Sequence, residues 1–213
     1  MSILNFQKPD KILLQKATDF QGLFEFRPLE PGFGQTIGNS LRRVLLSSLE
    51  GYAVSAIRIA GVDHEFSSIP GVVEDVVDII LNIKQIRLKS AVKGDKATEH
   101  QIYITISGQD EFRAKDIESK TNVFKVMNPE LLICRMEPSV NLELEMTITK
   151  GRGYVPAEEN MPENAPIGVI PVDAIYTPIK KVSYHVSNTR VGQRTDYEKL
   201  SIELETDGTI HPE

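Results

Sequence analysis

The sequence has a single cysteine and no long apolar run, and neither feature favours a secreted or membrane protein. Cys134 is the single cysteine, so an internal disulfide is excluded. No apolar run approaches the roughly 20 residues that a helix needs to span a bilayer. The start, MSILNFQKPDK, lacks the charged and apolar regions of a signal peptide. These absences together favour a cytoplasmic protein with no membrane partner.

An excess of positive charge is also missing. The chain has 24 basic and 30 acidic residues and a net charge of -6, so it is not expected to bind nucleic acid over a broad surface. Of its 213 residues, 40% are hydrophobic and 25% are charged, which is enough for a buried core and does not indicate disorder. This length allows one large domain or two small ones.

Groups that would carry metal or acid–base chemistry are scarce and scattered. The four histidines, His64, His100, His185 and His211, share no ligand spacing with one another or with Cys134. Cys134 lies in the apolar run LLICRM, which indicates a small buried side chain. No triad of aspartates is clustered for magnesium. We therefore expect no catalytic residue, no metal and no cofactor.

The stretch from Gly32 to Gly51, GFGQTIGNSLRRVLLSSLEG, predicts a helix over residues 36–50. Thr36 is the predicted N-cap, because its hydroxyl can accept a bond from an amide of the first turn. Gly51 suits the left-handed residue that ends a helix. At about 100° per residue, the helix has an apolar stripe and an arginine-rich stripe on opposite sides. The first consists of Ile37, Leu41, Val44 and Ser48, with Leu45 beside it, and the second of Asn39, Arg42, Arg43 and Leu46.

Two interpretations of the arginine-rich stripe stay open. A surface helix can carry one stray exposed leucine, because such leucines are common. Alternatively, arginines beside an apolar anchor are typical of an interface hot spot, which predicts a partner-binding face. The apolar stripe predicts packing against a core or a twin helix.

The remaining pattern is rich in strands. A hairpin is predicted at 12–16 and 23–27, and a strand at 54–59. Residues 71–86 predict a second amphipathic helix. Residues 94–99 predict a polar turn and residues 151–166 a long loop. Further strands are predicted at 102–106, 123–127, 131–136, 142–150, within 167–186 and at 199–205. Strands and helices do not alternate regularly, so the predicted fold class is α+β.

Three loop motifs carry weaker signals. The spacing Gly32-x-Gly34-x-x-x-Gly38 before a helix could bind a phosphate, but it is one residue too long for the dinucleotide fingerprint, and a tight turn is favoured. In KGRGY (150–154), Arg152 is either a solvated charge at a strand end or a functional loop residue. In TRVGQRTDYEKL, the side chains of Arg190, Arg194 and Asp196 could form a charge network or meet a partner.

Several long motifs, in one order, resemble the amino-terminal part of the bacterial RNA polymerase alpha subunit. They are GFGQTIGNSLRRVLLSSLEGYAV, IRIAGVDHEFSSIPGVVEDVVDIILNIK, KGRGYVPA and TRVGQRTDYEKLSIELETDGTI. The resemblance implies two lobes: a discontinuous dimerisation lobe, 1–50 plus 178–213, and an inserted β-rich lobe, 51–177. It also implies a non-catalytic subunit that forms a homodimer and recruits the beta and beta-prime subunits.

The resemblance also assigns roles to residues. Arg43 matches the arginine that holds the beta subunit, and Asn39, Arg42 and Leu46 share its face. Lys84 and Val172 match positions implicated in large-subunit contact, and Arg152 of KGRGY is added to them. The opposite stripe of Ile37, Leu41, Val44 and Ser48, with Phe33 nearby, is left for the core and the dimer seam.

Members of this family continue through a helix that completes the dimer and a small carboxy-terminal DNA-binding domain. This sequence stops at Glu213, where Pro212 and Glu213 suggest a helix that is just beginning. We therefore expect a piece of a longer chain, without that domain and without direct DNA binding. Two alternatives stay open: a metabolic enzyme that binds a nucleotide at the Gly32–Gly38 turn, and a dimeric scaffold outside transcription.

Overall fold

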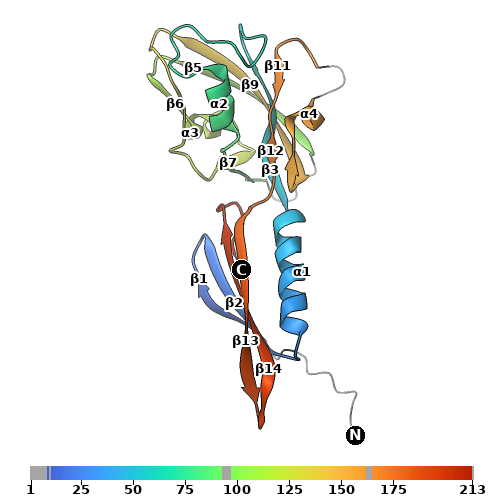
Figure 1. Ribbon diagram of the computed structural model, residues 1–213. Helices are drawn as coiled ribbons and strands as arrows, with labels where there is room; N and C mark the ends of the chain where they lie inside the picture. Colours follow the sequence, from blue (N-terminus) through green and yellow to red (C-terminus); the bar gives the residue numbers. More distant parts are fainter. Residues whose placement is uncertain (1–8, 10, 93–96, 162–164, 213) are drawn as a thin grey trace. The chain divides into compact units, whose positions relative to one another are not determined.

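The structure is a computed structural model that describes residues 9, 11–92, 97–161 and 165–212. It consists mostly of strands with a few helices, so the predicted α+β class is confirmed. The chain forms two compact units (Figure 1). One comprises Met1–Leu49 with Thr177–Glu213, and the other comprises Glu50–Tyr176. Within the described residues, no helix is both long and apolar enough to cross a membrane.

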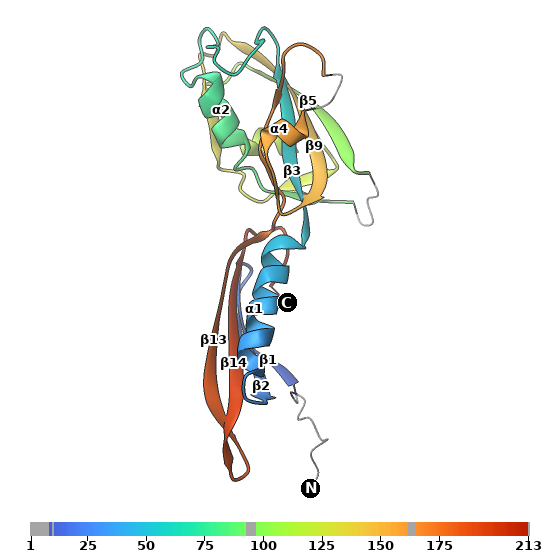
Figure 2. The ribbon, with the colours of Figure 1, turned by 45° about the vertical axis from the view of Figure 1, so that its right-hand side comes forward.

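In its described residues, the first unit is a four-stranded antiparallel sheet with one helix against it. The strand order is β1-β2-β14-β13. Their bounds are Lys11–Ala17 (β1), Gln21–Leu29 (β2), Ile179–Val191 (β13) and Arg194–Thr206 (β14). Helix α1, Phe33–Ser47, runs along β13 and β14, as Figure 2 shows. The predicted hairpin at 12–16 and 23–27 is confirmed by the pairing of β1 with β2.

Alternation along β14 explains which face of this sheet is buried. Leu200, Ile202 and Leu204 are buried, whereas Glu203 is exposed on the opposite face. Successive side chains of a strand point to opposite faces, so one face of β14 is apolar and the other polar. The apolar face forms the core of this unit with Leu29, Ile179 and Val182, and α1 packs against it.

Both predicted ends of α1 are wrong. The helix begins at Phe33, and its N-cap is Gly32, whose φ of 86° is left-handed and suits glycine. Thr36 lies inside the first turns, and its hydroxyl donates to the Gly32 carbonyl. The helix ends at Ser47. Gly51 instead lies in β3, where an added Cβ would come within 1.9 Å of the Tyr176 carbonyl oxygen. Position 51 therefore requires glycine because there is no room for a side chain, and not because a helix ends there.

The second unit is built on a six-stranded sheet. Its main order is β5-β9-β3-β4-β7, and β11 pairs with β3. The bounds are Glu50–Ile59 (β3), Leu88–Ser90 (β4), Glu99–Ser107 (β5), Phe124–Val126 (β7), Asn141–Arg152 (β9) and Val169–Pro171 (β11). Two small sheets pair β6 (Glu111–Arg113) with β8 (Leu132–Arg135), and β10 (Tyr154–Val155) with β12 (Ala174–Ile175).

Helix α2, Val76–Ile83, is shorter than predicted. Asp75 is its N-cap, and the Asp75 carboxylate accepts a bond from the Asp78 amide at 2.8 Å. Val76, Ile79 and Ile83 are buried against the core of this unit. The residues before Asp75 are not helical, because they bond to the segment around β8. Val72 forms an isolated bridge with Met136, and the Val73 amide donates to the Arg135 carbonyl.

Two short helices were not predicted. They are α3, Ala114–Glu118, and α4, Ala157–Asn160. The expected loop at 151–166 is partly regular, since β9 continues to Arg152 and β10 and α4 follow it. Residues 162–164 of that loop, and residues 94–96 of the expected polar turn, lie outside the described residues. Pro212 is not helical, and Glu213 also lies outside them.

Candidate partner-binding surfaces

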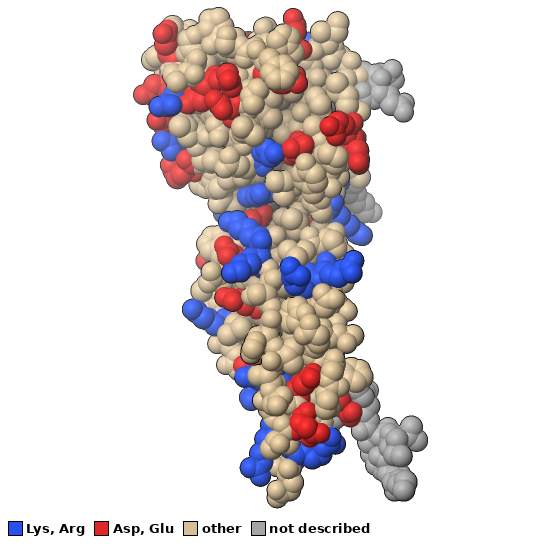
Figure 3. Space-filling model, in the orientation of Figure 1, with Lys and Arg blue, Asp and Glu red and all other residues tan. Residues whose placement is uncertain are grey.

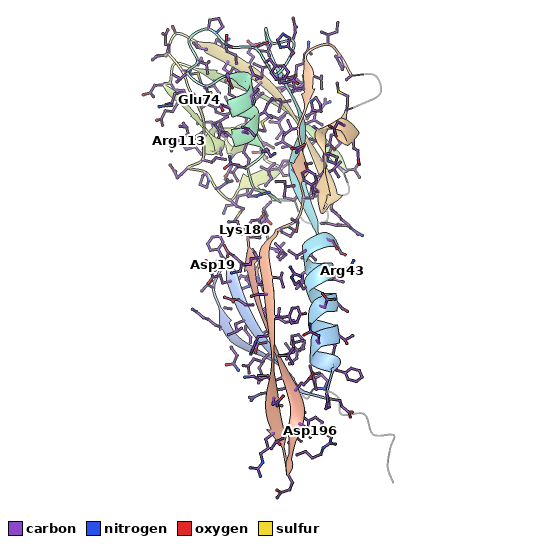
Figure 4. The ribbon with its side chains drawn as sticks, in the orientation of Figure 1. Asp19, Arg43, Glu74, Arg113, Lys180 and Asp196 are labelled. Carbon is purple, nitrogen blue, oxygen red and sulfur yellow. The ribbon has the colours of Figure 1, made fainter. Side chains whose placement is uncertain are left out.

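The outer face of α1 carries two exposed arginines. Arg42, Arg43 and Asn39 are all exposed. Figure 4 shows Arg43 on the side of α1 turned away from the strands of the same unit, and Figure 3 shows basic side chains over this helix. Among the described residues, neither arginine side chain forms an ion pair or a hydrogen bond with another side chain. The fold of this unit therefore leaves both guanidinium groups accessible to a partner.

Leu46 does not fit its predicted role as an exposed anchor. It is partly buried and packs against the core of the first unit, as do Leu45 and Leu49. The last turn of α1 thus uses the leucines on both sides of the helix for its own packing. Leu46 therefore packs partly against the core, its part in partner binding stays a prediction, and the exposed part of this face consists of Asn39, Arg42 and Arg43.

The apolar stripe of α1 divides into two parts. Ile37 and Leu41 are half-buried against the core of the first unit. Val44 is 51% exposed, Phe33 is 42% exposed, and Ser48 is exposed as well. The part of the stripe that the sheet does not cover is therefore the part that a twin helix could cover.

A carboxylate of β14 holds the start of α1. Glu198 accepts a bond from the Gly32 amide and another from the Gly34 amide, both at 2.8 Å. These amides are the donors that a phosphate would need at a helix N-terminus, where the helix dipole favours negative charge. A side chain of the chain itself occupies them, which argues against a nucleotide at this turn.

The glycines of this turn also allow close packing. An added Cβ at Gly38 would lie 2.6 Å from Cδ2 of Tyr184 and 2.9 Å from Cδ1 of Leu200. At Gly34 it would lie 2.8 Å from Cγ1 of Val186. The glycine spacing therefore serves the contact between α1 and the β13–β14 hairpin.

In the second unit, Arg152 lies at a strand end and not in a loop. It belongs to β9, where its Nη2 lies 2.6 Å from Oε1 of Glu50. Lys150 Nζ lies 2.7 Å from the other oxygen of the same carboxylate. The hydrogen bond from Lys150, followed by that from Arg152, lowers the pKa of Glu50 to about 2. Arg152 remains exposed, but its guanidinium is already paired.

Two facing glycines explain the other part of the KGRGY motif. Gly51 of β3 lies opposite Gly151 of β9. A Cβ at Gly151 would lie 2.6 Å from the Tyr176 ring, and the hydroxyl of Tyr176 bonds to the Thr149 hydroxyl at 2.7 Å. Both glycines therefore make room for Tyr176, which is buried.

Lys84 is bound within the second unit. Its Nζ lies 3.0 Å from Oδ2 of Asp173, and the two side chains are only 25% and 31% exposed. Oδ1 of Asp173 accepts a bond from the Ala157 amide, also at 3.0 Å. The hydrogen bond from Lys84 is the largest cause that lowers the pKa of Asp173. Asp173 could not be predicted from the sequence, because its partners lie 89 and 16 residues away.

Val172 is a core residue and not a contact residue. Its side chain is 1% exposed within the core of the second unit, so it cannot touch a partner protein directly. Its carbonyl accepts a bond from the Asn160 side chain at 2.8 Å. Lys84 and Val172 are thus both attached to the segment around α4.

The charged residues at the tip of the β13–β14 hairpin pair with their neighbours. Arg194 forms two hydrogen bonds with Asp196 and lies over the ring of Tyr197. Arg190 donates to the Gly192 carbonyl and is not part of that pair. Figure 4 shows Asp196 near this tip.

The buried thiol of the second unit has the features of an unreactive cysteine. Cys134 is fully buried, and burial raises the pKa of its thiol to about 12. Within the described ranges, no group of three or more histidine, cysteine, aspartate or glutamate residues could hold a metal ion.

Comparison with known proteins identifies the class to which this two-unit fold belongs. Residues 57–177 match the family described as "RNA polymerase Rpb3/RpoA insert domain", which is more than half of the chain. The chain therefore belongs to the RNA polymerase Rpb3/RpoA family. This match covers most of the second unit.

The full chain is similar to curated proteins named "DNA-directed RNA polymerase subunit alpha". It is 58% identical to that of Cytophaga hutchinsonii, 57% to that of Flavobacterium psychrophilum and 56% to that of Bacteroides thetaiotaomicron. Each alignment covers 100% of this chain and 64% of the relative. The resemblance to the amino-terminal part of the alpha subunit is confirmed, and the chain spans somewhat less than two thirds of these relatives' length.

Proposed function

We propose that this chain is the assembly part of a bacterial RNA polymerase alpha subunit. It pairs with a second copy, binds the beta and beta-prime subunits, and performs no chemistry itself. The first unit is the dimerisation lobe, and Glu50–Tyr176 is the inserted lobe. The observation that supports this most directly is the pair of exposed arginines on α1, whose side chains have no ion-pair or hydrogen-bond partner among the described residues. With a net charge of -6, the chain is not expected to bind DNA over a broad surface.

Arg43 is the residue that binds the beta subunit. Its guanidinium is planar and offers paired donors that lysine does not reproduce. It lies opposite the face of α1 that packs on the sheet, so its removal leaves the core of the unit intact. Arg43→Ala should reduce capture of purified beta by roughly thirtyfold, the effect of losing about 2 kcal/mol at a hot spot.

Two control variants separate binding from folding. Arg27 is an exposed arginine of the same unit that lies on β2, and Arg27→Ala should capture beta as the parent does. Leu41 is half-buried against the core, so Leu41→Ala should cost about 2 kcal/mol of stability, the low end for such a truncation. Normal capture by Arg43→Ala, or early melting of that variant, would show that the face is assigned wrongly.

The second copy pairs through the uncovered part of the apolar stripe. Val44→Asp places a charge where the twin helix is expected, and a charge without a partner is costly to bury. Sedimentation should show a weaker dimer for this variant than for Arg43→Ala. Equal dimer affinities for Val44→Asp and the parent would place the seam elsewhere.

A further inference from the structure

Asp173 connects three segments of the second unit. It lies between β11 and β12, and each oxygen of its carboxylate has a different partner. Oδ2 accepts from Lys84 at the C-cap of α2, and Oδ1 accepts from the Ala157 amide at the start of α4. The chain from α2 and the chain entering α4 are therefore attached to one side chain.

Other contacts tie the same segment to the residues around Asp173. Val155 of β10 pairs with Ala174 of β12. The Asn160 amide nitrogen donates to the Val172 carbonyl at 2.8 Å. Residues 155, 157 and 160 are thus bonded to residues 174, 173 and 172, respectively. Asp173 supplies the only charged group among these contacts of the described chain.

The segment held in this way is well exposed on its outer side. Tyr154 is 57% exposed, Met161 is 48% exposed, and Glu158 and Glu159 are exposed as well. Tyrosine and methionine are enriched in protein interfaces relative to the rest of a protein surface. We call Tyr154–Met161 the α4 segment.

We propose that Asp173 is a positioning residue, through which Lys84 serves large-subunit binding by holding the α4 segment in its binding shape. This inference rests on the function proposed above. The ammonium of Lys84 is bonded to the Asp173 carboxylate, and the Lys84 side chain is only 25% exposed, so a partner that used this ammonium directly would have to share it with Asp173. The surface that meets the large subunit is the α4 segment, with the exposed side chains of Met161 and of Tyr154, which also bonds to Asp173, as its contacts.

Variants of Lys84 and Asp173 distinguish positioning from direct contact. If Asp173 has a positioning role, Lys84→Met and Asp173→Ala both weaken capture of a large subunit, and the loss for Asp173→Ala is about tenfold. The double variant then captures no less than Asp173→Ala alone, because the two residues act as one unit. Under direct contact, Asp173→Ala frees the ammonium and capture is kept or improved. Asp173→Asn keeps an oxygen for the Ala157 amide and should retain part of the capture.

A second readout does not depend on any partner. Hydrogen exchange of the Ala157 amide in the isolated chain should be about tenfold faster in Asp173→Ala, because its acceptor is lost. Glu74→Ala is the matched control, since Glu74 also accepts from a backbone amide and from a cationic side chain, both of Arg135. That variant should leave Ala157 exchange and capture unchanged.

The outcomes separate the two proposals. Unchanged Ala157 exchange in Asp173→Ala, additive losses of capture in the double variant, or faster exchange with normal capture would each overturn the positioning role alone. A parent chain that captures neither large subunit would overturn the proposed function, and the positioning role with it. Faster exchange, weaker capture and no further loss in the double variant would support both.

Discussion

Glu198→Ala should release the start of α1 from the sheet of the first unit. The carboxylate bonds two amides at 2.8 Å each. Gly34 is buried, and an amide left without an acceptor there costs about 1–3 kcal/mol. Gly32 is exposed, so water replaces most of the second bond. The lost charge at the helix N-terminus adds about 0.3–1 kcal/mol. We expect a loss of about 2 kcal/mol in the free energy of unfolding.

Urea unfolding of the parent and the variant measures this loss, and hydrogen exchange locates it. The Gly34 amide should lose protection in Glu198→Ala, while amides in the middle of the helix keep more of theirs. Glu198→Gln retains one acceptor oxygen and should lose less stability. The matched control is Glu203→Ala, on the exposed face of the same strand, which should change stability by less than about 0.5 kcal/mol.

A Glu198→Ala variant that unfolds at the same urea concentration as the parent and protects the Gly34 amide equally well would contradict this prediction. That result would mean that water serves both amides as well as the carboxylate does. An equal loss in Glu203→Ala would also refute it, because the effect would then follow the strand and not the helix contact.

Two further predictions concern packing and charge. Gly38→Ala gains about 1 kcal/mol of helix propensity, but its Cβ would lie 2.6 Å from Tyr184, and overpacking costs about 1–3 kcal/mol. The melting temperature should fall, and a rise would mean that the ring moves aside easily. The pKa of Glu50 is lowered from 4.5 to about 2, so its stabilising contribution is present above pH 4.5 and is lost as pH falls toward 2. An NMR titration of Glu50 measures this directly, and a midpoint near 4.5 would contradict it.

The parts of the fold that follow from local pattern were predictable. The alternation in β14 and the apolar stripe of α1 each reflect a period set by backbone geometry. The spacing of 100° per residue correctly predicts that Arg43 is exposed and that Leu41 faces the sheet, because both lie in the regular middle of the helix. It does not predict the partial burial of Leu46, because the spacing alone does not show how closely the last turn approaches the sheet.

The remaining features depend on contacts between residues far apart in the sequence. The sequence favours Thr36 as the N-cap because its hydroxyl is a common cap, but the amides of the first turn bond to Glu198, 164 residues from Gly34. The local sequence favours Gly51 as a helix end, although this glycine is needed for the space around Tyr176. Asp173 gave no local signal, since an isolated aspartate next to a proline-containing strand is unremarkable until Lys84 is seen beside it.

The facing glycines around Tyr176 have a consequence for how the chain accommodates its insertion. Gly51 is at the entry of the second unit and Tyr176 is its last residue, and the two touch. The long insertion therefore begins and ends at one point. For the strands and helix of the first unit, the inserted unit is equivalent to a short loop. The entropy lost when the long insertion closes on itself is offset by contacts inside the inserted unit. Insertions or deletions far from Tyr176 can thus change the second unit without altering the chain path that the first unit must close.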